Sequence, residues 1–312
     1  MPVEMRDAFA NALVDLGAEF PKIVVLDADL NTSSKTVKFM QKWPRRSVQV
    51  GIAEQNLFGV AAGLATEGYI PFASTFACFA ARRALDQIAI SIAYPRLNVK
   101  IPGSYAGLPT SRAGASHNAI EDLAVMRAMP GMLVVDPGDN QELRSVMRAA
   151  VLYDGPVYFR ITRLTLPDMF DETYEFQWGK GQVVRPGADV TLAGTGMMTS
   201  LCLRAADLMA GMGVKAEVLH MGSVKPLDAQ LLLESTARTG AVVTAENASV
   251  IGGFGGAVAE VLGEYGPVPM KRIGVQDQWV ESGGIDELFT HHHMQPEDIA
   301  AAALQVIKAK KR

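Results

Sequence analysis

The sequence has few cysteines and no long apolar run. Its two cysteines, Cys78 and Cys202, lack metal-ligand spacing, so neither a disulfide framework nor a structural zinc site is expected. No apolar run approaches the roughly 20 residues that a membrane span needs. The opening residues, MPVEMRDAFANAL, include acidic side chains and do not form a secretory signal pattern. These absences predict a cytoplasmic protein that does not enter a membrane.

The sequence also lacks an excess of basic residues. Lys and Arg number 29 against 33 Asp and Glu, which gives a formal net charge of −4. Nucleic acid and anionic membrane surfaces are therefore not expected as partners, whereas small molecules and proteins are. What the chain does have is 49% hydrophobic residues over 312 positions. That is enough to bury a substantial core and to form two domains.

Short β-branched runs alternate with longer segments of helical period along the chain. Such runs occupy residues 23–26, 132–135, 157–159, 190–193 and 216–219. This alternation is typical of parallel βαβ units, so we predict an α/β fold with a mainly parallel sheet. Prolines, glycines and acidic residues break the pattern at 164–187, as a linker does. The predicted domains are 1–170 and a smaller α/β domain, 186–312.

One carboxylate, Glu54, lies between a short apolar strand at 48–50 and a helix of small residues at 57–66. A carboxylate so placed sits at the carboxyl end of a strand and beside a helix N-terminus. The alternative is an acid that merely caps the helix. The segments around Glu54 favour a functional role.

These segments together resemble the transketolase family. They are GIAEQN (51–56), PFASTFACF (71–79), RALDQI (83–88), GASHN (114–118), TAEN (244–247) and IGGFGGAV (251–258). The resemblance spans essentially the whole chain. It implies a thiamine-diphosphate-binding pyrimidine domain followed by the C-terminal domain of the family.

By this resemblance Glu54 is catalytic and binds the cofactor. Thiamine diphosphate reacts through a carbanion, which forms when the thiazolium C2 loses its proton. The cofactor's own 4′-imino group removes this proton, and it can do so only when the pyrimidine N1′ is protonated. A buried carboxyl supplies this through a hydrogen bond that strengthens in a water-poor site. Phe76 and Phe79, three apart at helical spacing, would stack on the aminopyrimidine. Aromatic pairs at this spacing also commonly pack in cores.

The resemblance assigns the other site residues to the sugar and to the cofactor entry. His117 resembles the catalytic histidine that faces the donor sugar. Arg163 is assigned to the phosphate end of the sugar, and Arg160 to the same end or to a structural role. Asp29 would bind near the cofactor entry and Ser33 would meet the sugar phosphate. Either could equally be a turn-forming residue.

Three positions depart from the family pattern. Ala113 stands where relatives commonly have an aspartate that selects sugar hydroxyl stereochemistry. Ala248 stands where many have a histidine, and Arg82 where full-length enzymes often have a tyrosine. The identity of the ketose and the aldose therefore stays open.

The chain has no Gly-Asp-Gly motif of the kind that holds the diphosphate through Mg²⁺ in this family. Its nearest string, Gly138-Asp139-Asn140, is typical of a helix N-cap. The run His291-His292-His293 is expected to lack carboxylate or cysteine company, so we predict a solvated loop and no metal site in this chain. Mg²⁺ and the diphosphate would be held by a separate N-terminal subunit, in an assembly such as an α2β2 heterotetramer.

The sequence thus predicts the C-terminal subunit of a two-chain transketolase, which transfers a two-carbon ketol unit from a ketose phosphate to an aldose phosphate. One alternative is the β subunit of a 2-oxoacid dehydrogenase, which pairs the same two domains. Another is a noncatalytic regulatory relative, which Ala113 and Ala248 allow.

Overall fold

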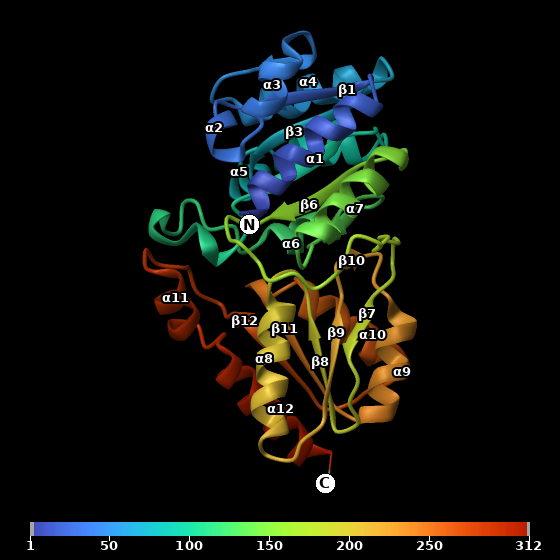
Figure 1. The fold of residues 1–312 in the computed structure, drawn as a ribbon, viewed down its shortest axis with the longest axis vertical. Helices are drawn as coiled ribbons and strands as arrows, with labels where there is room; N and C mark the ends of the chain where they lie inside the picture. The colour runs from blue at the N-terminus through green and yellow to red at the C-terminus, as the bar shows by residue number, and fades with distance from the viewer. Residues whose placement is uncertain (1–2, 311–312) are drawn as a thin grey trace.

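The computed structural model describes residues 3–310, and it contains two β-sheets that follow one another along the long axis, each flanked by helices (Figure 1). The outer ends of the two predicted domains, residues 1–2 and 311–312, lie outside the described residues. The predicted α/β fold is confirmed. Within residues 3–310 the longest apolar helices fall short of what a membrane crossing needs.

The first sheet has seven strands, and every pairing in it is parallel except that of β10 with β5. In spatial order the strands are β10 (Ser223–Lys225), β5 (Leu133–Val135), β6 (Val157–Ile161), β4 (Lys100–Ser104), β3 (Ile70–Phe76), β1 (Ile23–Asp27) and β2 (Ser47–Gln49). The central strands are buried along their whole length, which explains their continuous apolar runs.

Helices cover both faces of the first sheet. On one face α1 (Met5–Glu19) packs against α7 (Asn140–Leu152) and α3 (Val37–Lys42). The other face carries α4 (Glu54–Thr66), α5 (Ala77–Arg82), the π-helical η2 (Gln87–Ala93) and α6 (Asp122–Ala128). Alternate residues of β1 enter the two cores: Val25 packs on the α1 side and Val24 on the α4 side. Short turns complete this part: α2 (Asn31–Ser34), η1 (Pro44–Arg46) and η3 (Leu108–Ala113).

The second sheet has five strands, of which only β7 runs antiparallel to its neighbour. In spatial order they are β12 (Met270–Val275), β11 (Val242–Ser249), β8 (Val190–Gly194), β9 (Ala216–His220) and β7 (Gln182–Arg185). One face packs on α8 (Met198–Ala210) and α12 (Pro296–Ala309), the other on α9 (Ala229–Thr239) and α10 (Phe254–Tyr265). Helix α11 (Ile285–His291) instead contacts η3 of the first unit.

Two strands lie where the sequence pattern gave no reason to expect them. Strand β7 falls inside the segment predicted as a linker and pairs with β9. Strand β10 follows β9 in the chain but pairs with β5 of the first sheet, so the second half of the chain completes the edge of the first sheet. Both strands are only three or four residues long, too short to show a period. The domain limits 1–170 and 186–312 stay a prediction.

Candidate active site

Two predicted site residues and one further aromatic residue lie where parallel strands of the first sheet end. Phe76 is the last residue of β3, Tyr105 directly follows β4, and Arg163 follows β6 by two residues. In a parallel sheet these carboxyl ends share one edge, which is the usual place for a ligand site. Tertiary structure therefore brings Phe76 and Arg163, which are 87 positions apart in the chain, to the same edge of the sheet.

Glu54 is the first residue of α4 and is almost fully buried, at 1% exposure. Its Oε2 accepts a hydrogen bond of 3.0 Å from Arg83, a half-exposed side chain whose guanidinium also lies 5.2 Å from the centre of the Phe79 ring. Glu54 does not cap its helix through a side-chain bond, because the N-cap residue is Ala53. Arg83 thus links the buried carboxylate of Glu54 to the aromatic ring of Phe79.

Four rings form an aromatic row beside Glu54, which we define as Phe79, Phe76, His117 and Tyr105. Phe76 and Phe79 are stacked with centroids 5.7 Å apart and planes 18° apart, and Tyr105 lies 4.4 Å from Phe76. The His117 ring stands edge-on to Phe79 at 5.3 Å. Phe79, Tyr105 and His117 are partly exposed, so the row has surface that a ligand can contact. Phe76 ends a strand and does not sit in the helix that its spacing suggested.

Arg82 holds the loop that carries His117. From the end of α5 its guanidinium donates to the carbonyls of Ala115, at 2.9 Å, and Asn118, at 2.9 Å, and it pairs with Glu121. His117 itself bonds through Nδ1 to Ser116 Oγ at 2.8 Å. The arginine that departs from the family pattern therefore has a structural task, because it fixes the backbone on both sides of His117.

Two arginines meet at Tyr105. Arg163 lies 5.7 Å from the centre of that ring, and Arg6 donates to the Tyr105 hydroxyl at 2.5 Å. Arg6 also donates to the backbone carbonyl of Ser33 at 3.3 Å. Ser33 and Arg163, both predicted to meet the sugar phosphate, are thus joined through Arg6 and Tyr105. The sequence pattern missed these two linking residues. Tyr105 could have been found as the residue after a strand, but nothing local indicates Arg6.

Asp29 is exposed and follows β1 by two residues. Its backbone adopts a left-handed φ of 64°, and its N–H donates to Gln49 at 2.8 Å, which matches the turn-forming alternative. Its neighbour Asp27 organises this loop, since its carboxylate accepts bonds from Leu30 N–H at 2.6 Å and Thr36 at 2.9 Å. Burial raises the pKa of Asp27 above its usual range.

Arg160 is not available to a sugar phosphate. Its side chain is 2% exposed, and it donates to Asp122 at 2.8 and 3.1 Å, to Asp136 at 3.3 Å and to the Asn247 carbonyl at 2.9 Å. Asn247 belongs to the second sheet, so this guanidinium ties the two halves together. Of the two roles that the sequence left open for Arg160, the structure supports the structural one.

Two residues that depart from the family pattern, Ala113 and Ala248, differ in their exposure to solvent. Ala113 is exposed at the end of η3, next to the His117 loop, whereas Ala248 is fully buried in β11.

Asp139 is the N-cap of α7, as predicted, and accepts bonds from Glu142 N–H at 2.7 Å and Met169 N–H at 2.7 Å. Its carboxylate is therefore occupied by backbone donors.

The prediction that the histidine run has no carboxylate beside it is wrong. Glu281, ten residues before the run, lies 3.6 Å from His291 and 3.5 Å from His292. The chain folds back after Glu281 through α11, which the local sequence around the histidines does not reveal.

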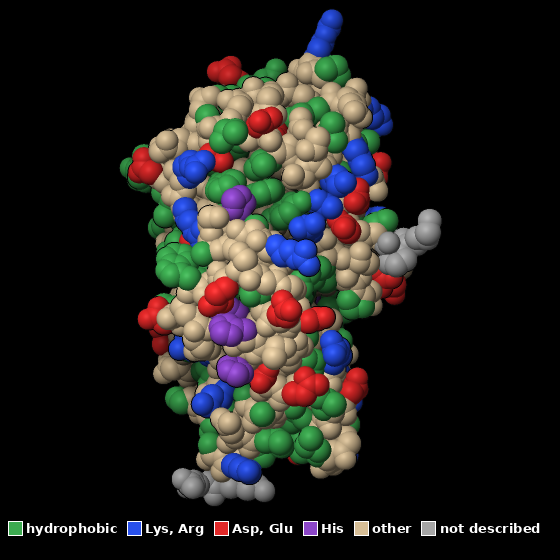
Figure 2. Space-filling model, turned by 90° about the vertical axis from the view of Figure 1, so that its left-hand side faces the viewer, with side chains coloured by type: hydrophobic (Ala, Val, Ile, Leu, Met, Phe, Trp, Pro, Cys, Tyr) green, Lys and Arg blue, Asp and Glu red, His purple; other side chains and the backbone are tan. Residues whose placement is uncertain are grey.

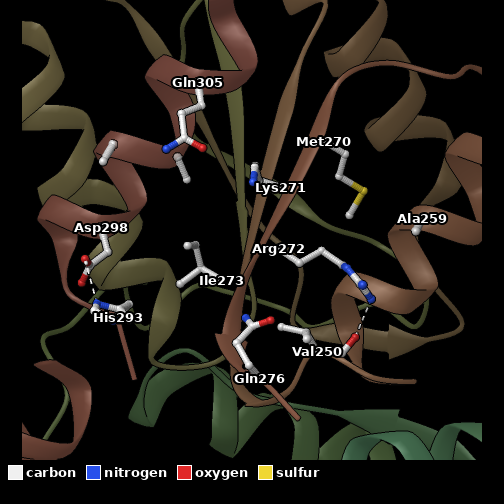
Figure 3. Close-up of a pocket in the computed structure, with 12 residues that line it drawn as sticks. Val250, Ala259, Met270, Lys271, Arg272, Ile273, Gln276, His293, Asp298 and Gln305 are labelled. Atoms are coloured by element: carbon white, nitrogen blue, oxygen red, sulfur yellow. Dashed lines mark hydrogen bonds and ion pairs between the residues drawn. The ribbon is translucent and has the colours of Figure 1, made fainter. Parts of the chain in front are cut away.

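A pocket of about 760 Å³ lies in the second unit (Figure 3), and none of its lining residues belongs to the aromatic row. It borders the edge strand β12, with Lys271 and Ile273 directed to one side of the strand and Arg272 to the other (Figure 3). Arg272 is occupied by the Val250 carbonyl at 2.7 Å. The charged side chains of Lys271 and Arg272 point to opposite sides of β12, so they cannot bind the same ligand together.

A buried acid, Glu246, organises the glycine-rich turn before α10. Its carboxylate accepts bonds from the N–H groups of Phe254, at 2.7 Å, and Gly255, at 2.8 Å. A Cβ on Gly253 would lie 2.0 Å from Glu246 Oε2, so glycine is required there for this close approach. Burial raises the pKa of Glu246 from its usual 4.5 to about 7.

We expect this pKa shift to make stability depend on pH. Between pH 4.5 and 7 the folded chain keeps a proton on Glu246 that the unfolded chain has lost, so stability falls as pH rises through that window and levels off above it. In urea unfolding across this range, the Glu246→Gln variant should lose less stability with rising pH than the wild type. An exposed control, Glu264→Gln, should follow the wild type. Parallel curves for Glu246→Gln and wild type would contradict the assignment.

Comparison with known proteins decides the family. A family model described as "Transketolase, pyrimidine binding domain" matches residues 1–169, and one described as "Transketolase, C-terminal domain" matches residues 179–299. The chain belongs to the transketolase family. The resemblance seen in the sequence is thereby confirmed, and family membership implies dependence on thiamine diphosphate.

Three of the similar proteins are covered along nearly their whole length. The 6-deoxy-6-sulfo-D-fructose transketolase subunit of Clostridium sp. (strain MSTE9) is 44% identical, over 98% of this chain and 95% of that protein. One subunit of the apulose-4-phosphate transketolase of Phocaeicola vulgatus is 34% identical, over 98% of both chains. A solved split-gene transketolase, described as an inactive β4 tetramer, superposes with a TM-score of 0.93 at 48% identity, covering 99% of both chains.

Proposed function

We propose that this chain is the C-terminal subunit of a two-chain transketolase that moves a two-carbon ketol unit from a ketose phosphate to an aldose phosphate. The observation that carries the proposal is the buried carboxylate of Glu54, which Arg83 links to Phe79 of the stacked pair Phe76 and Phe79. The extent of the match supports the two-chain arrangement, because the relatives named as subunits are covered almost end to end. The proposed domains are 1–170 and 186–312.

The residues present fit the pyrimidine half of thiamine diphosphate. When bound, this cofactor supplies a carbanion that carries the two-carbon unit. Glu54 would hold the proton at the pyrimidine N1′ in a site where water is excluded. Phe76 and Phe79 would hold the ring by stacking, and Asp29 would lie near its entry. Mg²⁺ and the diphosphate would be bound by the partner chain. In this chain the segment most similar to a Gly-Asp-Gly motif is Gly138-Asp139-Asn140, and there Asp139 serves as the N-cap of α7.

The sugar would lie between the aromatic row and the two arginines at Tyr105. His117 would donate to the donor sugar's oxygen atoms, held in place by Arg82. Arg163 and Ser33 would bind the anionic end of the sugar. The relatives' names include both a sulfonated sugar and a sugar phosphate, and both carry an anion that a guanidinium can bind.

The decisive experiment is ketol transfer by the chain with and without a partner. The partner would be a chain of similar size that carries Gly-Asp-Gly and a downstream Asn, co-expressed to form an α2β2 assembly. We expect thiamine-dependent transfer by the pair and none by the isolated chain. Transfer by the isolated chain would contradict the split site. Decarboxylation of a 2-oxoacid with a lipoyl acceptor would instead favour the dehydrogenase alternative, and a pair that binds cofactor without turnover would favour the regulatory one.

We expect the Arg163→Gln variant of the assembled enzyme to raise KM for a phosphorylated sugar by about tenfold or more, with a smaller change in kcat. Loss of a charge-assisted hydrogen bond typically costs about 1.5–3 kcal/mol. Steady-state kinetics with a phosphorylated and an unphosphorylated ketose measure this. The exposed Arg148→Gln variant is the control. Equal changes for the two ketoses would show that Arg163 does not contact the anionic end.

A further inference from the structure

Two histidines and a carboxylate converge in the second unit, outside the aromatic row. Glu281 Oε1 lies 3.6 Å from His291 Nε2, and Glu281 Oε2 lies 3.5 Å from His292 Nε2. The three potential ligand atoms all lie within 4.8 Å of one another. Two imidazole nitrogens and one carboxylate oxygen are a usual zinc ligand set. Zinc bonds of about 2.0–2.2 Å at tetrahedral angles place ligand atoms about 3.4 Å apart, so small side-chain rotations complete the geometry.

His292 gives a second, independent observation. Its side chain is fully buried, at 0% exposure, and its Nε2 has no hydrogen-bond partner within the described residues. Its other nitrogen, Nδ1, is 2.9 Å from the side-chain amide of Gln278. As the side chain stands, the amide nitrogen of Gln278 donates to Nδ1. A half-turn of this amide would bring its oxygen to Nδ1, which is the outer contact required when Nε2 binds a metal.

The surroundings favour a cation. From residue 273 to residue 307 the sequence has six acidic residues and no Lys or Arg. Histidines gather with acidic side chains on the lower part of the face shown in Figure 2. His291 and Glu281 are 60% and 59% exposed, so an ion can enter from solvent while His292 closes the inner side.

The same segment supports the loop that carries His117. Trp279, two residues before Glu281, stacks on Arg82 at 5.5 Å, and Arg82 holds that loop by its carbonyls. Next to Glu281, Ser282 approaches Gly114 so closely that a Cβ on Gly114 would lie 2.6 Å from Ser282 Oγ. An ion that fixes Glu281 to α11 would therefore also fix the support of the loop.

We propose that Glu281, His291 and His292 bind a divalent transition-metal ion of the zinc type, with water in the remaining position, and that this ion steadies residues 276–284 against the His117 loop. The site is separate from the Mg²⁺ proposed for the partner chain. It does not depend on the proposed ketol-transfer function, because binding is measured on this chain without thiamine diphosphate.

The test is titration of the untagged full-length chain with Zn²⁺ after chelator treatment, followed by calorimetry. We expect one saturable equivalent, and we expect Glu281→Gln and His291→Gln each to weaken binding by about tenfold or more. Both side chains are exposed, so these variants should fold even if His292→Gln does not. Hydrogen exchange of residues 276–284 should slow when Zn²⁺ is added.

His293→Gln is the matched control. His293 is adjacent in sequence, but its Nδ1 faces Asp298 at 3.8 Å, as Figure 3 shows, and it is 83% exposed. It should bind Zn²⁺ as the wild type does. The proposal is overturned if no single saturable equivalent appears, if Glu281→Gln and His291→Gln bind normally, or if His293→Gln weakens binding as much as His291→Gln.

Discussion

We expect the Glu54→Gln variant of the assembled enzyme to lose about 10²–10⁴-fold in turnover, the usual effect of removing a general acid–base group. Glutamine keeps the size of the side chain but cannot hold an acidic proton at a ring nitrogen. The variant should fold, because the group left behind, Arg83, is half exposed and can be solvated. Turnover is measured by ketol transfer at saturating cofactor and substrates.

Glu67→Gln is the control for this prediction. Glu67 follows the same helix α4 at its opposite end and is exposed, so its variant should keep the turnover of the wild type. Circular dichroism and co-purification with the partner should be unchanged in both variants. If Glu54→Gln kept more than a tenth of the turnover, the role of Glu54 in catalysis would have to be abandoned.

We expect the Arg160→Met variant to be destabilised by about 3–5 kcal/mol, the typical effect of removing one partner of a buried ion pair. Asp122 is fully buried and Asp136 is 6% exposed, so both carboxylates would lose their cation without gaining water. The Asn247 carbonyl would lose its donor at the same time. Urea unfolding of the full chain measures the change in the free energy of unfolding.

Arg148→Met is the matched control, because Arg148 also forms two hydrogen bonds with one carboxylate, that of Glu19, but both side chains are about half exposed. Exposed pairs contribute about 0–1 kcal/mol. The deficit of Arg160→Met should also be smaller near pH 5 than near pH 8, since protonation of an unpaired buried carboxyl removes its charge. A deficit that does not change with pH would indicate a packing defect alone.

Local patterns in the sequence were enough to find several strands and to pick out polar residues at two helix starts. The β-branched runs at 23–26, 157–159 and 190–193 became β1, β6 and β8, because buried parallel strands need continuous apolar residues. Glu54 and the Asp139 cap were found for a similar reason, since a polar residue at an element boundary is visible from its neighbours alone. Strands β7 and β10 are only four and three residues long, so they are too short to show an alternation of apolar and polar residues, and the sequence pattern did not predict them.

The sequence by itself determined that this is an α/β protein of the transketolase family and which side chains have the chemistry for a pyrimidine site. Only the tertiary structure decided which of those side chains meet. It buried Arg160 in an ion pair with Asp122, joined Arg6 to Tyr105 and brought Glu281 to the histidine run. The physical reason is that composition and period report on neighbours along one chain segment, whereas a site is made by side chains that distant segments place within a few ångströms of each other.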